Sequence, residues 1–106
     1  MLFKKLKING VTLKNRIVVS PMCQYSAKKG CPTDWHFTHL SKLINSGASM
    51  LMIESTAIEN NGKISHKDLC LNNDKQEKKF KELKDFLKNI NQIPIGLQIS
   101  HSGRKG

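Results

Sequence analysis

The side chains that could perform chemistry lie in three short segments of this 106-residue chain. Residues 20–25 contain a cysteine and a tyrosine, residues 55–57 contain two hydroxyls, and residues 98–104 contain a glutamine, a histidine and an arginine. Each segment coincides with the end of an apolar run typical of a strand. Because functional residues of parallel α/β proteins gather where the strands end, we expect the three segments to face the same end of the molecule.

Three cysteines and two neighbouring histidines raise the question of disulfides and metals. Cys23, Cys31 and Cys70 are odd in number, widely spaced and without a Cys-x-x-Cys pair, so neither a disulfide framework nor a zinc site is indicated. His36 and His39 could present two ligands on one face of a predicted helix, but no third ligand follows at a useful spacing. We expect packing or capping roles for these histidines and no metal.

Two other ionisable residues lie in or next to these segments. Glu54 falls within a predicted strand, where a buried acid with a perturbed pKa and a structural partner of Arg16 are equally compatible with the sequence. His101 follows the last predicted strand and either packs or orients neighbouring loops. Neither residue is assigned to the site.

The hydrophobic pattern predicts alternating strands and helices. Asn9-Gly10 between two alternating segments favours a type I′ turn and therefore a β-hairpin. The β-branched run that ends at Pro21 suits a strand buried on both faces. In chain order the expected elements are a hairpin of residues 6–8 and 11–13, strands at 16–20, 49–57 and 95–99, and helices at 35–46 and about 74–90.

Both predicted helices carry an apolar stripe and a capping signal. Thr33 or Asp34 can cap the first helix, and Asp74 with Glu77 has the spacing of a capping box at the start of the second. Each stripe predicts the face that packs on the sheet. The first stripe comprises Phe37, Leu40, Leu43 and Ile44, and the second comprises Phe80, Leu83, Phe86, Leu87 and Ile90.

This order predicts an α/β fold with right-handed crossovers and a parallel sheet. Three parallel strands leave two open edges, so we expect residues 1–106 to form an incomplete part of one domain. No apolar run approaches the length of a bilayer span or a signal peptide, and we expect a cytoplasmic protein that does not bind membranes.

The formal charge of +10 raises the possibility of nucleic-acid binding. Only Arg16 and Arg104 are arginines, and aromatic residues make up 6% of the chain, whereas base recognition favours both residue types. The lysines are scattered from Lys4 to Lys105. We therefore expect no nucleic-acid partner, and a basic binding module is the least favoured alternative.

Four ordered blocks of sequence resemble one known family. The blocks are residues 13–26, with Ser20-Pro21-Met22-Cys23, residues 34–40, residues 53–57, and residues 98–105. They resemble the Old Yellow Enzyme family of NADH:flavin oxidoreductases, and the cysteine after Ser-Pro-Met is similar to that of its bacterial NADPH dehydrogenase and xenobiotic reductase branch. Several ordered motifs over the whole chain are a specific signal.

The resemblance implies the N-terminal portion of an FMN-binding (β/α)₈ TIM barrel, made of the β-hairpin, three strands and two helices. It implies hydride transfer from NADPH or NADH through FMN to activated C=C bonds of small enone-type substrates. Cys23 is expected to tune the flavin and Tyr25 to contact the substrate. The residues expected to bind the cofactor are Ser20, Pro21, Met22, Cys23, Ala57 and Gln98.

The resemblance also indicates what these 106 residues do not contain. The family's histidine pair, which holds the substrate carbonyl, and its phosphate-binding loops lie later in the chain. The fragment is therefore expected to supply one wall of the flavin site and to be inactive alone. An inactive truncated product remains an alternative. The family often forms dimers or tetramers, so a homo-oligomer is compatible with the full-length protein, and its oligomeric state stays open. The natural substrate and the choice between NADPH and NADH stay open.

Overall fold

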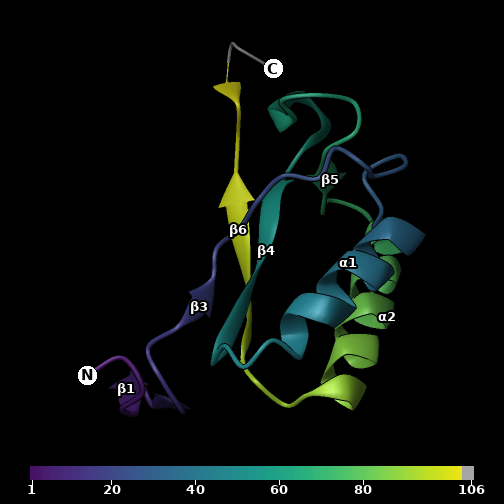
Figure 1. The fold of residues 1–106 in the computed structure, drawn as a ribbon. Coiled ribbons are helices and arrows are strands. Elements are labelled where there is room, and N and C mark those ends of the chain that lie inside the picture. The colour runs from purple at the N-terminus through teal and green to yellow at the C-terminus, as the bar shows by residue number, and fades with distance from the viewer. Residues whose placement is uncertain (104–106) are drawn as a thin grey trace.

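The computed structural model describes residues 1–103 and opens with a hairpin. Strands β1 (Leu6–Ile8) and β2 (Val11–Leu13) pair antiparallel, and Asn9 and Gly10 between them have φ angles of 46° and 82°. Two successive positive φ angles define the type I′ turn that Asn-Gly favours. The predicted hairpin is confirmed. It lies at the amino end of the main sheet, away from the helices (Figure 1).

A parallel sheet forms the body of the molecule, with β4 (Met50–Ala57) at its centre. Strand β6 (Ile95–Ser100) pairs along one edge of β4. On the other edge, β3 (Val18–Val19) pairs with the first residues of β4 and β5 (Leu69–Cys70) with its last two. All these pairings are parallel, so the carboxyl ends of β3, β4 and β6 point the same way (Figure 1).

Helices α1 (Asp34–Ile44) and α2 (Asp74–Ile90) cover one face of this sheet, as Figure 1 shows. The apolar stripes of the helices meet the apolar side chains of the sheet, which stabilises the fold by removing both from water. The buried core consists of Ala27, Leu40, Ile44, Leu51, Ile53, Leu69, Leu83, Leu87 and Ile93. The predicted α/β class and the two predicted helices are confirmed.

Several details differ from the sequence prediction. The first parallel strand is only two residues long, and Val18 is 42% exposed because no element covers it on the face away from the helices. Phe86 and Ile90, placed on the buried stripe of α2, are each 40% exposed at its edge. Strand β5 and a 3₁₀ turn, η1 (Asn60–Gly62), were not predicted, because a two-residue pairing and a single turn leave too short a pattern to recognise.

The cap of α2 also lies one residue earlier than predicted. Asn73 has an extended backbone, and its side chain accepts a hydrogen bond of 2.8 Å from the backbone N–H of Gln76. Asp74 is already the first helical residue, where its charge favours the helix dipole but its side chain is not the cap. The predicted pair of Asp74 and Glu77 is therefore wrong by one position. Within residues 1–103, no helix has the length and apolarity needed to cross a bilayer.

Candidate functional site

The three segments singled out in the sequence lie at the carboxyl ends of three adjacent strands. Ser20 follows β3, Ala57 ends β4, and Gln98 lies two residues before the end of β6. Since these strands are parallel and neighbours, the segments share one end of the sheet and extend across it. Arg104 lies outside the described residues.

An irregularity in the β4–β6 pairing shapes this end of the sheet. Ile53 pairs with Leu97 but Thr56 pairs with Ile99, so β4 has one extra residue and both Glu54 and Ser55 lie opposite Gln98. A bulge of this kind redirects side chains and is frequent beside active sites.

After the bulge, neighbouring side chains of β4 point in opposite directions. Ser55 forms a hydroxyl–hydroxyl hydrogen bond with Ser100, on the face of the sheet away from the helices. Glu54 points toward α1, where it meets His36. Without the extra residue, the regular alternation of a strand would place Glu54 on the same face as Met52. The bulge therefore brings a carboxylate under the loop that follows β3.

Glu54 holds the loop that carries Cys23 and Tyr25. Its Oε2 accepts a 3.0 Å hydrogen bond from the backbone N–H of Gln24, and its Oε1 lies 3.3 Å from Nε2 of His36. Both side chains of this pair are buried, with exposed fractions of 5% for Glu54 and 1% for His36. A buried carboxylate costs free energy unless its oxygens are hydrogen-bonded, and here both oxygens have a partner.

The contacts of His36 determine where its proton lies. Nδ1 is 2.9 Å from the backbone nitrogen of Thr33, and since a backbone N–H can only donate, Nδ1 must be the acceptor. Nε2 therefore carries the hydrogen and donates to Glu54. The Thr33 hydroxyl in turn donates to the carbonyl of Ser26 at 2.9 Å. A neutral histidine thus links the cap of α1 to the acid that supports the loop.

The loop between these two anchors is strained at Tyr25. Tyr25 has φ = +51°, a left-handed conformation that is unfavourable for a bulky side chain. The backbone N–H of Gln24, one residue before it, is fixed by Glu54, and the N–H of Ala27, two residues after it, donates to the carbonyl of Lys67 at 2.9 Å. Such strain persists where the surroundings fix it, and it is common at functional sites. The Tyr25 side chain is 52% exposed.

The Cys23 thiol lies close to the end of β4 and is partly buried. Burial raises its pKa above the usual value, and the nearby carboxylates of Glu54 and Asp68 raise the pKa further. Polar groups of the Ser55 backbone and the Tyr25 side chain act in the opposite direction. The thiol is therefore protonated at neutral pH. It is poorly suited to act as a nucleophile, because the thiolate is the reactive form.

The other predicted cofactor-binding residues differ in accessibility. Ala57 is 2% exposed, so it contributes its small size and its backbone rather than an accessible side chain. The remaining residues reach the surface to different degrees: Ser20, Met22 and Gln98 are exposed and Pro21 is half-buried. Cys23 and Tyr25 approach each other beside β4, whereas Gln98 lies across β4 on the neighbouring strand.

The loops after β4 and β6 are tied together by His101 and Ser102. His101 Nε2 lies 2.6 Å from Oε1 of Glu59, and its ring occupies the space beside Gly62 that a Cβ atom would need. The Ser102 backbone N–H donates to the carbonyl of Gly62 at 2.8 Å. Of the two roles considered for His101, orienting neighbouring loops is the one that these contacts support.

The histidines of α1 are structural in this structure, as expected. His36 takes part in the helix cap, and His39 stacks on Trp35 with ring centroids 5.4 Å apart. Residues 1–103 contain no cluster of three side chains arranged to hold a metal ion. The partner of Glu54 is His36 and not Arg16, so the ion pair considered in the sequence is wrong. Only a spatial contact between residues 18 positions apart reveals this pair.

Comparison with known proteins identifies the family. The sequence model that describes the NADH:flavin oxidoreductase / NADH oxidase family matches residues 1–106 of this chain. A NADH:flavin oxidoreductase of Gibberella zeae is 45% identical over 97% of this chain, and a NADPH dehydrogenase of Listeria monocytogenes serotype 4b is 44% identical over 98%. The chain spans 25% and 31% of the length of these two relatives.

Solved structures confirm the fold. Morphinone reductase superposes with a TM-score of 0.87 at 21% identity, and the old yellow enzyme of Trypanosoma cruzi with 0.87 at 23%. Each match covers 99% of this chain, but 27% and 28% of the other protein. Morphinone reductase has also been solved in complex with tetrahydroNAD. The sheet and two helices thus correspond to the first part of a TIM barrel, and the chain belongs to the NADH:flavin oxidoreductase / NADH oxidase family.

Proposed function

We propose that this chain forms one wall of the FMN site of an NAD(P)H-dependent oxidoreductase that reduces activated C=C bonds of enone-type substrates. Family membership supports FMN and NAD(P)H, because the family consists of FMN-dependent NAD(P)H oxidoreductases. The observation that carries the proposal is the convergence of residues 20–25, Ala57 and Gln98 at one end of a parallel sheet. Residues 1–106 would then be the N-terminal part of a single FMN-binding domain.

The open face of the sheet has the chemistry that a flavin needs. Gln98 exposes an amide there, which can both donate to and accept from the polar edge of an isoalloxazine ring. Gly96, on the same face, leaves room that the ends of Met50 and Met52 fill in this structure. Met22 adds an exposed, polarisable side chain at the end of β3. An apolar surface with one well-placed amide fits a flat aromatic cofactor.

The chemistry that FMN supplies when bound is hydride transfer between NAD(P)H and the substrate. This chain's own residues position the reacting groups. The Cys23 thiol, held neutral, places a small polarisable group without added charge beside the proposed flavin site. The exposed Tyr25 phenol would donate a hydrogen bond to a substrate carbonyl oxygen, and the Glu54 anchor and the strained backbone fix its direction.

The experiment that tests the proposal is purification of the full-length protein followed by flavin analysis. We expect co-purified FMN and oxidation of NADPH or NADH when 2-cyclohexenone is added. Replacing Gln98 with Leu, which keeps the size but removes the amide, should weaken FMN binding at least tenfold. Replacing the exposed Ile99 with Val serves as the matched control. A folded protein that neither contains nor takes up FMN would overturn the proposal.

A further inference from the structure

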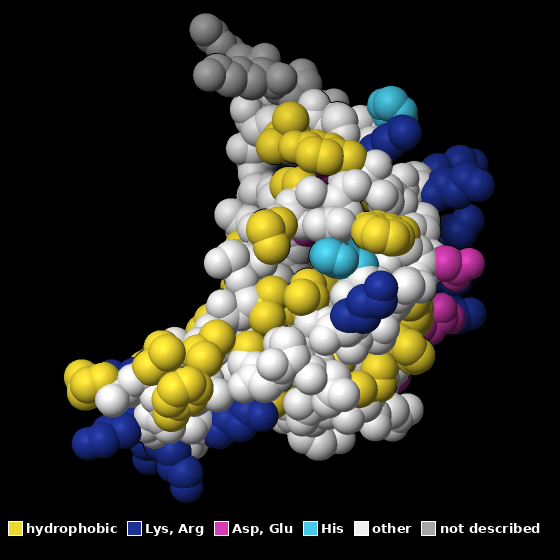
Figure 2. All heavy atoms as spheres, viewed as in Figure 1, with side chains coloured by type: hydrophobic (Ala, Val, Ile, Leu, Met, Phe, Trp, Pro, Cys, Tyr) yellow, Lys and Arg dark blue, Asp and Glu magenta, His cyan; other side chains and the backbone are white. Residues whose placement is uncertain are grey.

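A basic hollow lies beside Tyr25, between the loops that follow β3 and β4. It has a volume of about 660 Å³, and its lining includes Tyr25, four lysines (Lys28, Lys29, Lys63 and Lys67) and His66. Two of the lysines come from the loop after β3 and two from the loop after β4. On this side of the molecule, basic side chains gather above the acidic ones (Figure 2).

The four lysines of this hollow carry uncompensated charge. None forms an ion pair with an acid among residues 1–103, where the side-chain pairs are His36–Glu54, Lys79–Glu82 and His101–Glu59. The loop after β4 has two acids. Glu59 pairs with His101, and Asp68 is buried, with its oxygens accepting hydrogen bonds from Ile64 N, Ser65 N and Ser65 Oγ. On α2, by contrast, acids are interspersed among the lysines of the exposed surface, and Lys79 pairs with Glu82. The excess positive charge of the hollow favours an anionic ligand.

The backbone that carries these lysines is firmly held. Lys28 and Cys31 exchange backbone hydrogen bonds of 3.1 and 3.0 Å, and Gln76 Nε2 donates to the carbonyl of Lys29 at 3.1 Å. Gly30 has φ = +79° and lies so close to Cys70 that a Cβ atom would be 2.8 Å from the Cys70 Cβ. Because Ala27 also donates to Lys67, the two loops form one unit and present their charges together.

We propose that this hollow binds the phosphate on the adenosine ribose of the reductant, and thereby selects NADPH over NADH. The inference rests on the proposed function, since it places a dinucleotide at the neighbouring site. Lysine ammonium groups are strong phosphate ligands, and that phosphate is the group by which the two dinucleotides differ. Tyr25 lines the hollow and also belongs to the proposed substrate site, so a dinucleotide whose nicotinamide reaches the flavin passes next to the lysines.

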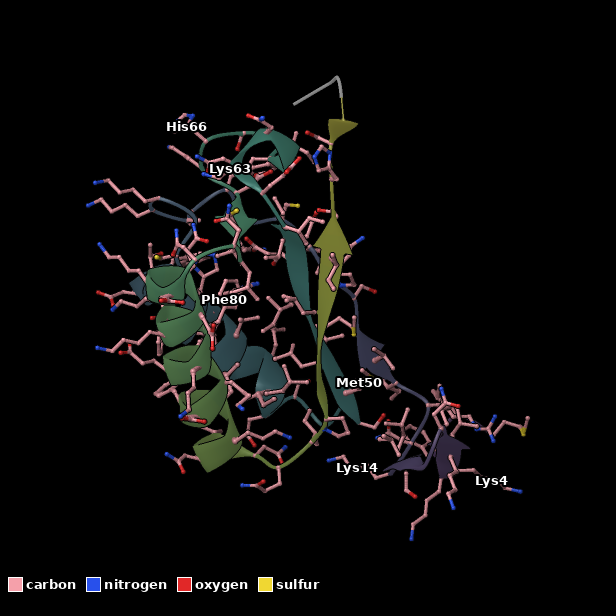
Figure 3. All side chains as sticks on the ribbon, turned by 180° about the vertical axis from the view of Figure 1, so that it is seen from behind. Lys4, Lys14, Met50, Lys63, His66 and Phe80 are labelled. Atoms are coloured by element: carbon pink, nitrogen blue, oxygen red, sulfur yellow. The ribbon has the colours of Figure 1, made fainter. Side chains whose placement is uncertain are left out.

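Charge-neutralising variants of the full-length, FMN-loaded protein test this proposal. With Lys63→Gln and Lys67→Gln combined, we expect the KM for NADPH to rise about tenfold, with kcat and the KM for NADH nearly unchanged. The matched control combines Lys4→Gln with Lys14→Gln, which removes the same charge at the opposite end of the molecule, as Figure 3 shows. Equal effects on both dinucleotides, equal effects of both double variants, or no effect would each overturn the proposal.

A binding measurement separates failure of this inference from failure of the proposed function. Calorimetry of the same full-length protein with adenosine 2′,5′-bisphosphate and with adenosine 5′-monophosphate needs no turnover. We expect the bisphosphate to bind more tightly, with an affinity that falls as salt is added and that the lysine variant loses. If FMN is absent yet this preference holds, the proposed function fails and the hollow remains a phosphate site. If FMN and turnover are present without the preference, the hollow is not such a site.

Discussion

In the first half of β4, residues 50–53, the side chains that point toward the helices are buried, whereas those on the opposite face are partly exposed. Leu51 and Ile53 pack in the core between the sheet and the helices. Met50 and Met52 lie on the other face, across Gly96 of β6. The same strand thus has one face that contributes most to stability and one face with chemical groups accessible to a ligand.

The two faces are not independent, because Glu54 connects them. The extra residue in β4 turns this carboxylate toward the helices, where it accepts from His36 and from the backbone of the loop after β3. The loop then carries Cys23 and Tyr25 above the end of the sheet. The loop on the accessible side of the molecule is therefore positioned by the buried contacts that Glu54 makes with Gln24 and His36. The predictions below separate the two contributions.

The largest loss of stability is expected from substitutions on the helix-covered face of the sheet. Leu87 is fully buried between α2 and the sheet, so Leu87→Ala should lower the free energy of unfolding of the full-length protein by about 2–5 kcal/mol. Ile90→Ala, on the exposed edge of the same helix, should cost about 1 kcal/mol or less. Urea denaturation measures both values. Similar losses for the two variants would contradict the division between faces.

A smaller effect on stability and a larger one on the loop are expected from Glu54→Gln. Both oxygens of Glu54 accept from donors, so the amide nitrogen of the new side chain must face either the N–H of Gln24 or the Nε2–H of His36, and two donors cannot hydrogen-bond each other. We expect a loss of about 1–3 kcal/mol and faster hydrogen exchange at the Gln24 amide. Glu59→Gln, whose partner His101 is exposed, is the control and should leave Gln24 unchanged. Unchanged exchange in Glu54→Gln would show that the loop does not depend on this anchor.

The contrast between the faces also explains what the sequence could predict. The hairpin, both helices and the parallel strands β3, β4 and β6 produce local patterns, such as Asn9-Gly10 or the stripe of Leu83 and Leu87, and these patterns predict them. The family blocks placed the candidate residues at the strand ends. The bulge at Glu54 and its pairing with His36 were not predicted, because they depend on the register between β4 and β6 and on how α1 packs. Such contacts join distant residues and leave no periodic signal.

The cap of α2 provides a smaller test of the helix-covered face. Asn73→Ala removes the side chain that accepts from Gln76 N and should cost about 1 kcal/mol. Asp74→Ala removes only a charge in the first turn. In about 0.5 M salt, screening should abolish the cost of Asp74→Ala, while the cost of Asn73→Ala should persist. Thermal unfolding of both variants measures this, and an equal salt dependence would restore Asp74 as the cap.

The smallest effect concerns the reactivity of two cysteines. Cys23 lies on the accessible side of the molecule and Cys70 in its interior. Burial raises the pKa of both the Cys23 and Cys70 thiols, but Cys23 is partly accessible beside Tyr25, whereas Cys70 is fully buried in β5. Iodoacetamide should therefore label Cys23 in the folded protein, slowly at neutral pH and faster as the pH rises above the usual thiol pKa. Cys70 should react only on unfolding. Mass spectrometry of labelled peptides distinguishes the two residues.

Because the pKa of Cys23 is raised in the folded protein, this residue should also affect how the stability of the protein depends on pH. The folded protein holds the thiol proton more tightly than the unfolded chain, so the contribution of Cys23 to stability is complete below the unfolded pKa. As the pH rises above that value, the unfolded chain ionises first, and the contribution is lost until the folded thiol also ionises. Cys23→Ala should therefore reduce the alkaline loss of stability seen in the parent protein. A steeper alkaline loss in the variant would mean that the folded loop favours the thiolate, and the accessible side would then carry a nucleophile instead of a neutral thiol.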